Sequence, residues 1–401
     1  MHITAVICEY NPFHNGHLYL NSQIKQAAAA NTIAEQNTAV VAIMSGNFVQ
    51  RGGIAIASKF ARARAALQNG ADIVIELPTV FAVSCAEVYA RAGVAIADAL
   101  GCVNSLAFGS ECGDIDDLLQ TVQAVDLPQV QQEVAKQMAD GCYYPKALQA
   151  AVDTHCGEKY ASLLGSPNNV LGLEYCKALQ NAATQITPVT FKRVGVEHHS
   201  TKAMGNIASA SYIRQLLAEQ TTELNPFEFV PQNTIELLAN TADFKKLQAP
   251  LLYKLRTMGL SELAALPDVT EGLENRIAQA IRTSSNVDEI LEKVKTKRYT
   301  MARLRRILVC ALLGITAQMQ AEDVQYIRVL GFNKTGEKVL AELKHTARLP
   351  VVTNVADGYA ALPQKAKELF DIDIKATDVF GLAAEKSMSC GLDFTQQIIK
   401  V

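Results

Sequence analysis

The chain has 401 residues, of which 49% are hydrophobic and 19% charged, and its formal net charge is −3 at pH 7. This balance predicts an ordinary globular protein with a sizeable core and excludes a uniformly basic nucleic-acid-binding protein, so any contact with nucleic acid has to come from a local patch. The first apolar run lacks a preceding basic region and no run reaches the length of a membrane span, so we expect a cytoplasmic protein that does not contact membranes.

The amino-terminal segment predicts a strand, a tight loop and a helix. The apolar run at residues 3–7 is followed by Glu9-Tyr10-Asn11-Pro12-Phe13-His14-Asn15-Gly16-His17-Leu18. β-Branched residues favour the strand and Asn-Pro favours the loop, while the apolar spacing of the next residues is helical. We therefore expect the helix to begin near His14.

His14 and His17 are three positions apart, so in a first helical turn both imidazoles project from roughly one face. The free amides of that turn carry the positive end of the helix dipole, and Gly16 lets another group approach the backbone closely. Imidazoles beside free amides suit phosphate oxygens that gain charge during phosphoryl or nucleotidyl transfer. Zinc binding is an alternative that lacks further ligands, because the nine cysteines are scattered, and hydrogen-bonded surface histidines are another.

Three further apolar runs at residues 38–44, 71–77 and 105–108 alternate with helical patterns. This alternation predicts a doubly wound parallel sheet covered on both faces. Ligands of such sheets lie beyond the carboxyl ends of the strands, so we expect the loop after each strand to border one crevice. The intervening helix near Lys59 to Arg64 is basic.

Two later stretches place polar residues at element ends. Asn168 starts a helix, where it serves either as a cap or as a ligand contact, and Arg193 ends a strand predicted at residues 188–194. An arginine at a strand's carboxyl end can reach phosphate or carboxylate, although a solvated strand end is the alternative. Ser209 or Ser211 can cap the helix that follows them.

The second half is different in composition. Residues 225–313 are helical in pattern, and residues 293–306 contain seven positive side chains and no acidic one. Such a cluster predicts a footprint for a polyanion, and Tyr299 could stack on an unpaired base; a solvated helix face is the alternative. Residues 322–355 return to a strand-helix-strand pattern, which predicts a small α/β lobe.

These residues resemble a known family. His14-Asn15-Gly16-His17 is similar to the HxGH signature of the nucleotidyltransferase superfamily, which includes class I aminoacyl-tRNA synthetases and phosphopantetheine adenylyltransferase. The longer string from Glu9 resembles the tRNA(Met) cytidine acetate ligases. Residues 207–214 resemble a second signature, ISSTxIR, although Ala208 and Ala210 depart from it.

The resemblance implies a nucleotidyltransferase domain at residues 1–222 and a mainly helical tRNA-binding region at residues 223–401. It implies ATP-dependent activation of acetate to acetyl-adenylate, then transfer of the acetyl group to N4 of the wobble cytidine of elongator tRNA(Met). His14 and His17 would be catalytic, ATP would arrive with Mg²⁺, and no residue set marks a metal site. The implied ATP site comprises Ile7, Cys8, Glu9, Tyr10, Asn11, Pro12, Phe13, His14, Asn15, Gly16, His17, Leu18, Tyr19, Leu20, Gly109, Asn168, Arg193, Ser211 and Arg214.

For tRNA, we predict contacts from the basic cluster at Lys295, Lys297, Arg298, Arg303 and Arg306. Two functions of other classes stay open at this point. One is an adenylyltransferase that acts on a small phosphorylated cofactor precursor and needs no RNA. The other is a non-catalytic RNA-binding protein built on the same fold.

Overall fold

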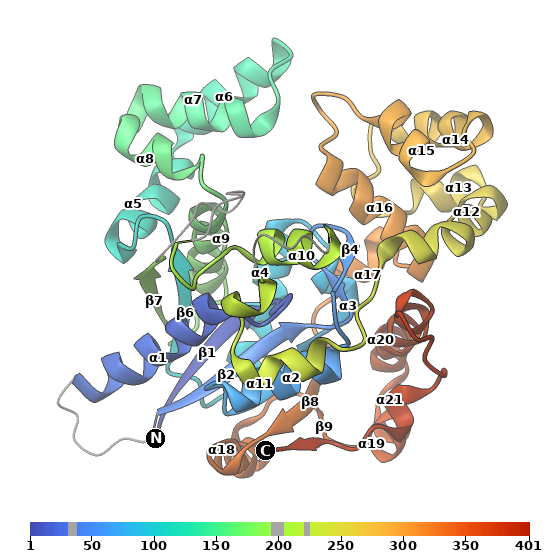
Figure 1. The fold of residues 1–401 in the computed structure, drawn as a ribbon. Coiled ribbons are helices and arrows are strands. Elements are labelled where there is room, and N and C mark those ends of the chain that lie inside the picture. Colours follow the sequence, from blue (N-terminus) through green and yellow to red (C-terminus); the bar gives the residue numbers. More distant parts are fainter. Residues whose placement is uncertain (31–37, 194–203, 220–224) are drawn as a thin grey trace.

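The computed structural model of the protein describes residues 1–30, 38–193, 204–219 and 225–401. These residues form an eight-stranded sheet whose order is β10-β8-β5-β2-β1-β6-β7, with β9 also paired to β8 (Figure 1). The five parallel strands are β1 (His2–Cys8), β2 (Thr38–Ser45), β5 (Ile73–Leu77), β6 (Ser105–Ser110) and β7 (Thr187–Lys192). The predicted doubly wound parallel sheet is confirmed.

Side chains of these strands alternate between two cores, because successive residues of a strand point to opposite faces. In β1, Ile3, Ala5 and Ile7 join the larger core, whereas Val6 and Cys8 join the smaller one. The larger core includes side chains of α4 (Ala86–Ala99) and α9 (Pro167–Asn181), and the smaller one those of α1 (Asn15–Ala30) and α2 (Lys59–Gln68). Both faces are therefore covered, which explains the continuous apolar runs.

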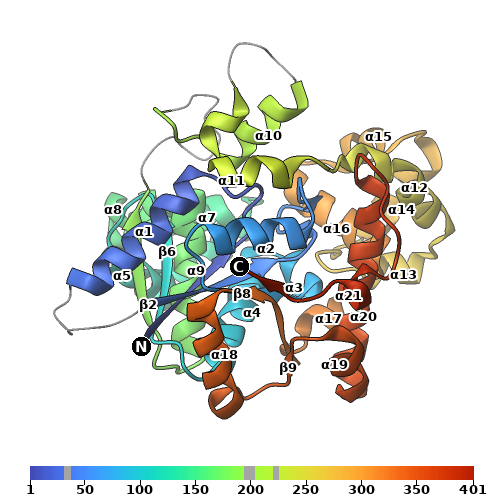
Figure 2. The same cartoon turned by 60° about the horizontal axis from the view of Figure 1, so that its bottom comes forward.

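The predicted α/β lobe at residues 322–355 is not a separate sheet. Strand β8 (Ile327–Phe332) pairs antiparallel with β5 and thereby extends the amino-terminal sheet, while β9 (Val351–Val352) and β10 (Ile399–Lys400) pair with β8. Figure 2 shows β8 and the carboxyl terminus beside α2. The proposed boundary at residues 222 and 223 lies outside the described residues, as does Val194 of the predicted strand 188–194.

Two groups of helices project beyond the carboxyl edge of the sheet on either side of α10 (Ala210–Glu219) (Figure 1). The first contains α5 (Ile115–Val125), α6 (Pro128–Ala139), α7 (Tyr144–Cys156) and α8 (Glu158–Leu163). The second contains α12 (Gln248–Thr257), α13 (Leu260–Ala264), α14 (Leu273–Thr283), α15 (Val287–Val294) and α16 (Met301–Leu313). The predicted helical character of residues 225–313 is confirmed.

The remaining elements are short or close the fold around the sheet. They include the hairpin formed by β3 (Phe48–Val49) and β4 (Gly53–Ile54). The other helices are α3 (Thr79–Ala82), α11 (Gln232–Ile235), α17 (Ala317–Ala321), α18 (Lys334–Thr346), α19 (Val355–Ala361), α20 (Gln364–Ala383) and α21 (Leu392–Thr395).

Candidate active site

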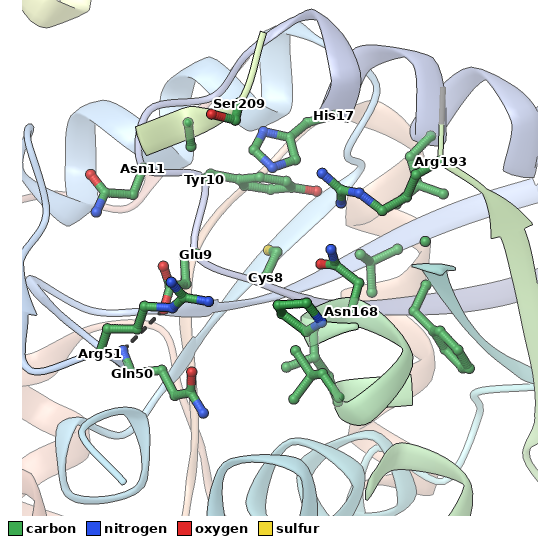
Figure 3. A pocket seen from close by; sticks show the side chains of 18 of the residues that line it. Cys8, Glu9, Tyr10, Asn11, His17, Gln50, Arg51, Asn168, Arg193 and Ser209 are labelled. Atoms are coloured by element: carbon green, nitrogen blue, oxygen red, sulfur yellow. Dashed lines mark hydrogen bonds between the residues drawn. The ribbon is translucent and has the colours of Figure 1, made fainter. Parts of the chain in front are cut away.

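A cavity of about 260 Å³ opens at the carboxyl edge of the sheet (Figure 3). Its walls come from the loop after β1, the β3–β4 hairpin, and the amino-terminal ends of α4, α9 and α10. These segments lie far apart in the chain, and the parallel strand order brings them together at one edge. The expected crevice is therefore present.

Most residues of the predicted ATP site line this cavity. They are Ile7, Cys8, Glu9, Tyr10, Asn11, His14, His17, Leu20, Gly109, Asn168, Arg193, Ser211 and Arg214. Gly16 and Tyr19 line an adjoining cavity of about 50 Å³ that shares both histidines. ATP contacts by all of these residues stay a prediction.

Four members of the predicted set do not line either cavity. Pro12 and Phe13 are buried, and Phe13 packs into the smaller core. The Asn15 side-chain amide donates to the carbonyls of Asn206 and Glu228, at 2.8 and 3.0 Å. The Leu18 side chain is exposed. In this structure these residues shape or anchor the loop rather than face the cavity.

The two imidazoles stack on one another at the start of α1, with ring centroids 3.7 Å apart and an interplanar angle of 23°. The backbone N–H of His14 donates to His17 Nδ1 at 3.2 Å, and the N–H of Gly16 donates to His14 Nδ1 at 3.0 Å. His14 thus precedes the helix and folds back over its first turn. Both Nδ1 atoms are acceptors, so each neutral ring carries its proton on Nε2.

The surroundings keep these rings neutral. Burial, followed by the positive charges of Arg193 and Arg214, lowers the pKa of His14 from 6.5 to about 3. Burial, then His14 and Arg193, lower the pKa of His17 well below its usual value. The pair therefore offers neutral Nε2–H donors to an anion, and a bound phosphate would be stabilised by hydrogen bonds rather than by imidazolium charge.

Gly16 makes the stacked arrangement possible. A Cβ at this position would lie 2.9 Å from His14 Cε1 and 3.0 Å from His14 Nδ1. Such a contact is closer than van der Waals packing allows, so any other residue would displace the ring. The group that the sequence analysis expected to approach Gly16 is the His14 imidazole itself.

Arg62 fixes the loops beneath the cavity. Its guanidinium donates to the carbonyls of Glu9 at 2.6 Å, Ser45 at 3.1 Å and Gly46, and Nε donates to Ala57 at 3.0 Å. Burial lowers its pKa to about 10, so the group stays charged at neutral pH. One buried cation therefore joins the carboxyl ends of β1 and β2.

Asn168 does not cap its helix, because Glu111 takes that role. The Glu111 carboxylate accepts from the Asn168 side chain at 2.7 Å, from its backbone N–H at 3.2 Å and from the Asn169 N–H at 2.7 Å. The Asn169 side chain in turn accepts from the N–H groups of Glu111 and Cys112. This reciprocal lock holds the Asn168 side chain at the cavity wall.

Gly109 accommodates Arg193. A Cβ on Gly109 would lie 3.1 Å from Arg193 Cγ, so the missing side chain leaves room for the arginine. Sequence analysis predicts this glycine as an ATP contact; the observed neighbour is the aliphatic part of Arg193. The guanidinium is thereby directed toward His17 (Figure 3).

The start of α10 forms another part of the cavity wall. Ser209 Oγ accepts from the Tyr212 N–H at 3.1 Å and lies 3.0 Å from Ser211 Oγ, so Ser209 is the residue that caps this helix. Arg214, one turn later, donates to the Asn11 carbonyl at 2.5 Å. Ala208 and Ala210, which depart from the ISSTxIR pattern, leave both hydroxyls and the arginine in place.

Two of the predicted crevice loops lie below the cavity rather than in its wall. Asn47, after β2, accepts from the Lys59 N–H at 2.7 Å and donates to Thr377 at 3.2 Å. Glu76, near the end of β5, binds Lys59 Nζ at 2.8 Å and Arg328 at 2.9 Å. Asp393 pairs with the same two cations, at 2.9 and 2.6 Å. These charges satisfy one another in the interior, so the loops turn inward.

Residues that sequence reasoning missed also line the cavity. Gln50 and Arg51 come from the β3–β4 hairpin, while Tyr89 comes from the first turn of α4 and Tyr175 from the middle of α9. An arginine directly before Gly52-Gly53, after the second strand, was a usable signal for the hairpin. The two tyrosines had none, because helical spacing explains them equally well as core residues.

The structure divides the predicted tRNA-binding residues. Arg303 donates to the Asp268 carbonyl at 2.9 and 2.6 Å, and Arg306 binds the Asp268 carboxylate at 3.0 and 2.8 Å. Lys295 and Lys297 are exposed, as is Arg298, which lies 3.7 Å from Glu271. Tyr299 packs beneath the guanidinium of Arg303 at 5.1 Å. Two of the predicted tRNA contacts, Arg303 and Arg306, therefore bind the Asp268 loop within the protein.

Within the described part of the chain, no group of three or more His, Cys, Asp or Glu side chains could hold a metal ion. The described helices likewise include none that is long and apolar enough to cross a bilayer. The cavity thus combines neutral imidazole donors, three arginines and a capped helix start. Such a set can hold a polyphosphate and stabilise charge on it during transfer.

Comparisons with known proteins agree with this geometry. A family model described as HIGH Nucleotidyl Transferase matches residues 1–392. The tRNA(Met) cytidine acetate ligases of Thermoanaerobacter sp. (strain X514) and Caldanaerobacter subterraneus are 38% and 37% identical to the chain, each with 100% of both chains covered. The crystal structures of Thermotoga maritima TmcAL, apo and with alpha-thio ATP, match with TM-scores of 0.91 and 0.89 at 31% and 30% identity, again over 100% of both chains.

Proposed function

Because the chain belongs to the tRNA(Met) cytidine acetate ligase family of HIGH nucleotidyltransferases, we propose that it activates acetate with ATP and acetylates N4 of the wobble cytidine of elongator tRNA(Met). It is an ATP-dependent ligase. The observation that carries the proposal is the stacked His14–His17 pair, with Nε2–H donors in a cavity that also contains Arg193 and the start of α10.

In the first step, an acetate oxygen attacks the α-phosphorus of ATP and the bond to pyrophosphate breaks. The Nε2–H groups of His14 and His17 donate to the α-phosphate oxygens, on which negative charge accumulates. Arg193, Arg214 and the Ser209–Ser211 helix start offset the charge of the remaining phosphates. The rings are fixed by backbone N–H groups before the substrate arrives, so little reorganisation accompanies the reaction.

In the second step, the N4 amine of cytidine attacks the acetyl carbonyl and the bond between the acetyl carbon and the phosphate oxygen breaks. The amine releases a proton as the amide forms, and AMP leaves with that oxygen. ATP is expected to arrive as a Mg²⁺ complex. Glu9 is the one acidic side chain among the described residues that line the cavity, so the ion would be held mainly by phosphate oxygens and water. Mg²⁺ would supply charge neutralisation there.

The direct test is mass analysis of tRNA after incubation with the protein, ATP and labelled acetate. We expect one acetyl group on the wobble cytidine, and none when ATP or acetate is omitted. Incorporation of AMP into a phosphopantetheine-like substrate without any use of acetate would instead establish the small-molecule adenylyltransferase.

The histidines provide the second test. His14→Ala and His17→Ala should each lower acetate-dependent pyrophosphate exchange by about two orders of magnitude, as expected when a group that stabilises transition-state charge is removed. A denaturation midpoint close to that of the unmodified protein would show that the loss is chemical. Full exchange activity in both variants would contradict the mechanism and would favour a non-catalytic RNA-binding protein.

A further inference from the structure

One end of the cavity carries Gln50 and Arg51, which are not members of the predicted ATP site, beside Glu9, which is. Glu9, Gln50 and Arg51 lie together at the side opposite Asn168 and Arg193 (Figure 3). The Glu9 carboxylate accepts from the Gln50 backbone N–H at 3.0 Å, which joins the loop after β1 to the β3–β4 hairpin. Glu9 and Gln50 are half-buried and Arg51 is exposed, so a ligand can reach all three.

The carboxylate decides what kind of ligand suits this end. A polyphosphate is strongly negative, and placing it against Glu9 would bring like charges together. The phosphate donors His17, Ser209 and Arg193 lie elsewhere in the same cavity. Arg214 interacts electrostatically with both Glu9 and Arg51, so it lies between this end and the phosphate groups. The end therefore fits a neutral ligand that both donates and accepts hydrogen bonds.

Building on the proposed function, we propose that Glu9, Gln50 and Arg51 form the subsite for the cytosine ring of the acceptor nucleotide. Cytosine presents an N4 amine that donates and N3 and O2 atoms that accept, and carboxylates are known partners of that amine. Glu9 would accept from N4, while the Arg51 guanidinium and the Gln50 side-chain amide would donate to N3 and O2. Uracil reverses the first two positions, so it would meet a carboxylate with its O4 and a guanidinium with its N3–H.

The position of the hairpin supports this assignment. Gly52 has a φ of +74°, and a Cβ there would lie 2.3 Å from the Arg306 backbone nitrogen and 2.4 Å from the Arg305 carbonyl carbon. The hairpin therefore packs directly on the start of α16, where the basic residues 293–306 lie. Bases in single-stranded loops can be turned out and read on their pairing edges, so a nucleotide of an anticodon loop held at this basic segment can reach the subsite.

The experiment compares the affinities of two tRNA(Met) transcripts that differ only in having cytidine or uridine at the wobble position, with AMP present to fill the nucleotide end. We expect the unmodified protein to prefer cytidine by roughly 5- to 150-fold, the range of a good bidentate contact. Arg51→Met and Glu9→Gln should reduce the preference to about threefold or less. The matched control is Arg64→Met, which removes an exposed arginine of α2 outside the cavity and should keep the preference.

Two results would overturn the subsite. One is a preference for cytidine that is the same in Arg51→Met, Glu9→Gln and the unmodified protein. The other is a KM for ATP in pyrophosphate exchange that rises in Arg51→Met more than the nucleotide preference falls, which would make this end a phosphate site. Acetyl transfer to tRNA by the unmodified protein is measured separately, so failure of the ligase assignment is distinguishable from failure of the subsite.

Discussion

Two segments of this protein, helix α2 and residues 293–306, are basic in sequence but differ in how far their cations are buried. In α2, Lys59 and Arg62 are buried, at 0% and 2% exposed. In residues 293–306, Lys295, Lys297 and Arg305 are exposed, while Arg306 is mostly covered. The inner cations hold the protein together, whereas the outer ones are available to a partner.

The difference follows from where acceptors are concentrated. The carboxyl ends of parallel strands present several backbone carbonyls to one side, and Arg62 satisfies those of Glu9, Ser45 and Gly46 at once. In the outer segment, the Asp268 loop accepts from Arg303 and Arg306, and the Thr283 carbonyl accepts from Lys293. The number of positive residues in a segment therefore indicates how many can bind RNA only after the cations that already bind acceptors within the protein are left out.

The largest effect is expected from Arg62→Met. The substitution leaves buried carbonyls without a donor, and breaking such a buried charged network costs roughly 3–5 kcal/mol. Urea unfolding should show this loss of stability together with loss of pyrophosphate exchange. Arg64→Met on the same helix, where the side chain is exposed, should change stability by less than about 0.5 kcal/mol. Equal effects of the two substitutions would remove the distinction between inner and outer cations.

A smaller effect is expected at the Arg306–Asp268 pair. Its members are 13% and 26% exposed, so solvent screening is partial and we expect a coupling of about 1–2 kcal/mol. A double-mutant cycle with Arg306→Ala and Asp268→Ala measures it by denaturation. If the coupling is near zero and Arg306→Ala alone strongly reduces the affinity for tRNA, Arg306 belongs to the RNA-binding surface after all.

The combined substitution Lys295→Ala, Lys297→Ala and Arg305→Ala should have an effect of similar size, but on the free energy of tRNA binding and not on stability. It should weaken tRNA binding about five- to tenfold near physiological salt and reduce the salt slope by about two, because these cations displace counterions from phosphates. Stability and acetate-dependent pyrophosphate exchange serve as internal controls. An unchanged salt slope would leave α16 and its preceding loop with a structural role only.

The smallest effect is on the pH dependence of stability, and it compares a buried arginine that stays charged with a buried histidine that stays neutral. Arg62 stays charged because carbonyls surround it, but the pKa of His14 falls from 6.5 to about 3 in the folded protein. The unfolded chain therefore binds the extra proton first, and the stability that neutral His14 contributes is complete above pH 6.5 and is lost as the pH falls toward about 3. Between pH 7.5 and 6 this loss is about 0.8 kcal/mol. Unfolding of His14→Asn should lack that part of the pH dependence.

Local patterns in the sequence predict the sheet, the His14–His17 motif and a crevice at the strand ends, whereas most of the residues that line the cavity are predicted by the resemblance to the family. The sequence does not predict that Glu111 would hold Asn168 or that Arg193 would pack over Gly109, since those contacts join segments far apart in the chain. The sequence also does not predict that the Glu76 side chain points into the interior. The cause is the pair Lys59 and Arg328, and a charged residue is ordinarily expected at the surface.

The addition of β8 and β10 to the catalytic sheet has a consequence for biosynthesis. Arg328 and Asp393 complete the ionic cluster under the active site, and β10 flanks β8 at residues 399 and 400. A ribosome delivers Lys59 and Glu76 well before Arg328 and Asp393, so the first two residues lack their remaining counter-charges while the intervening chain is made. Nascent chains should accordingly stay inactive until β8 and α21, which carry Arg328 and Asp393, have emerged.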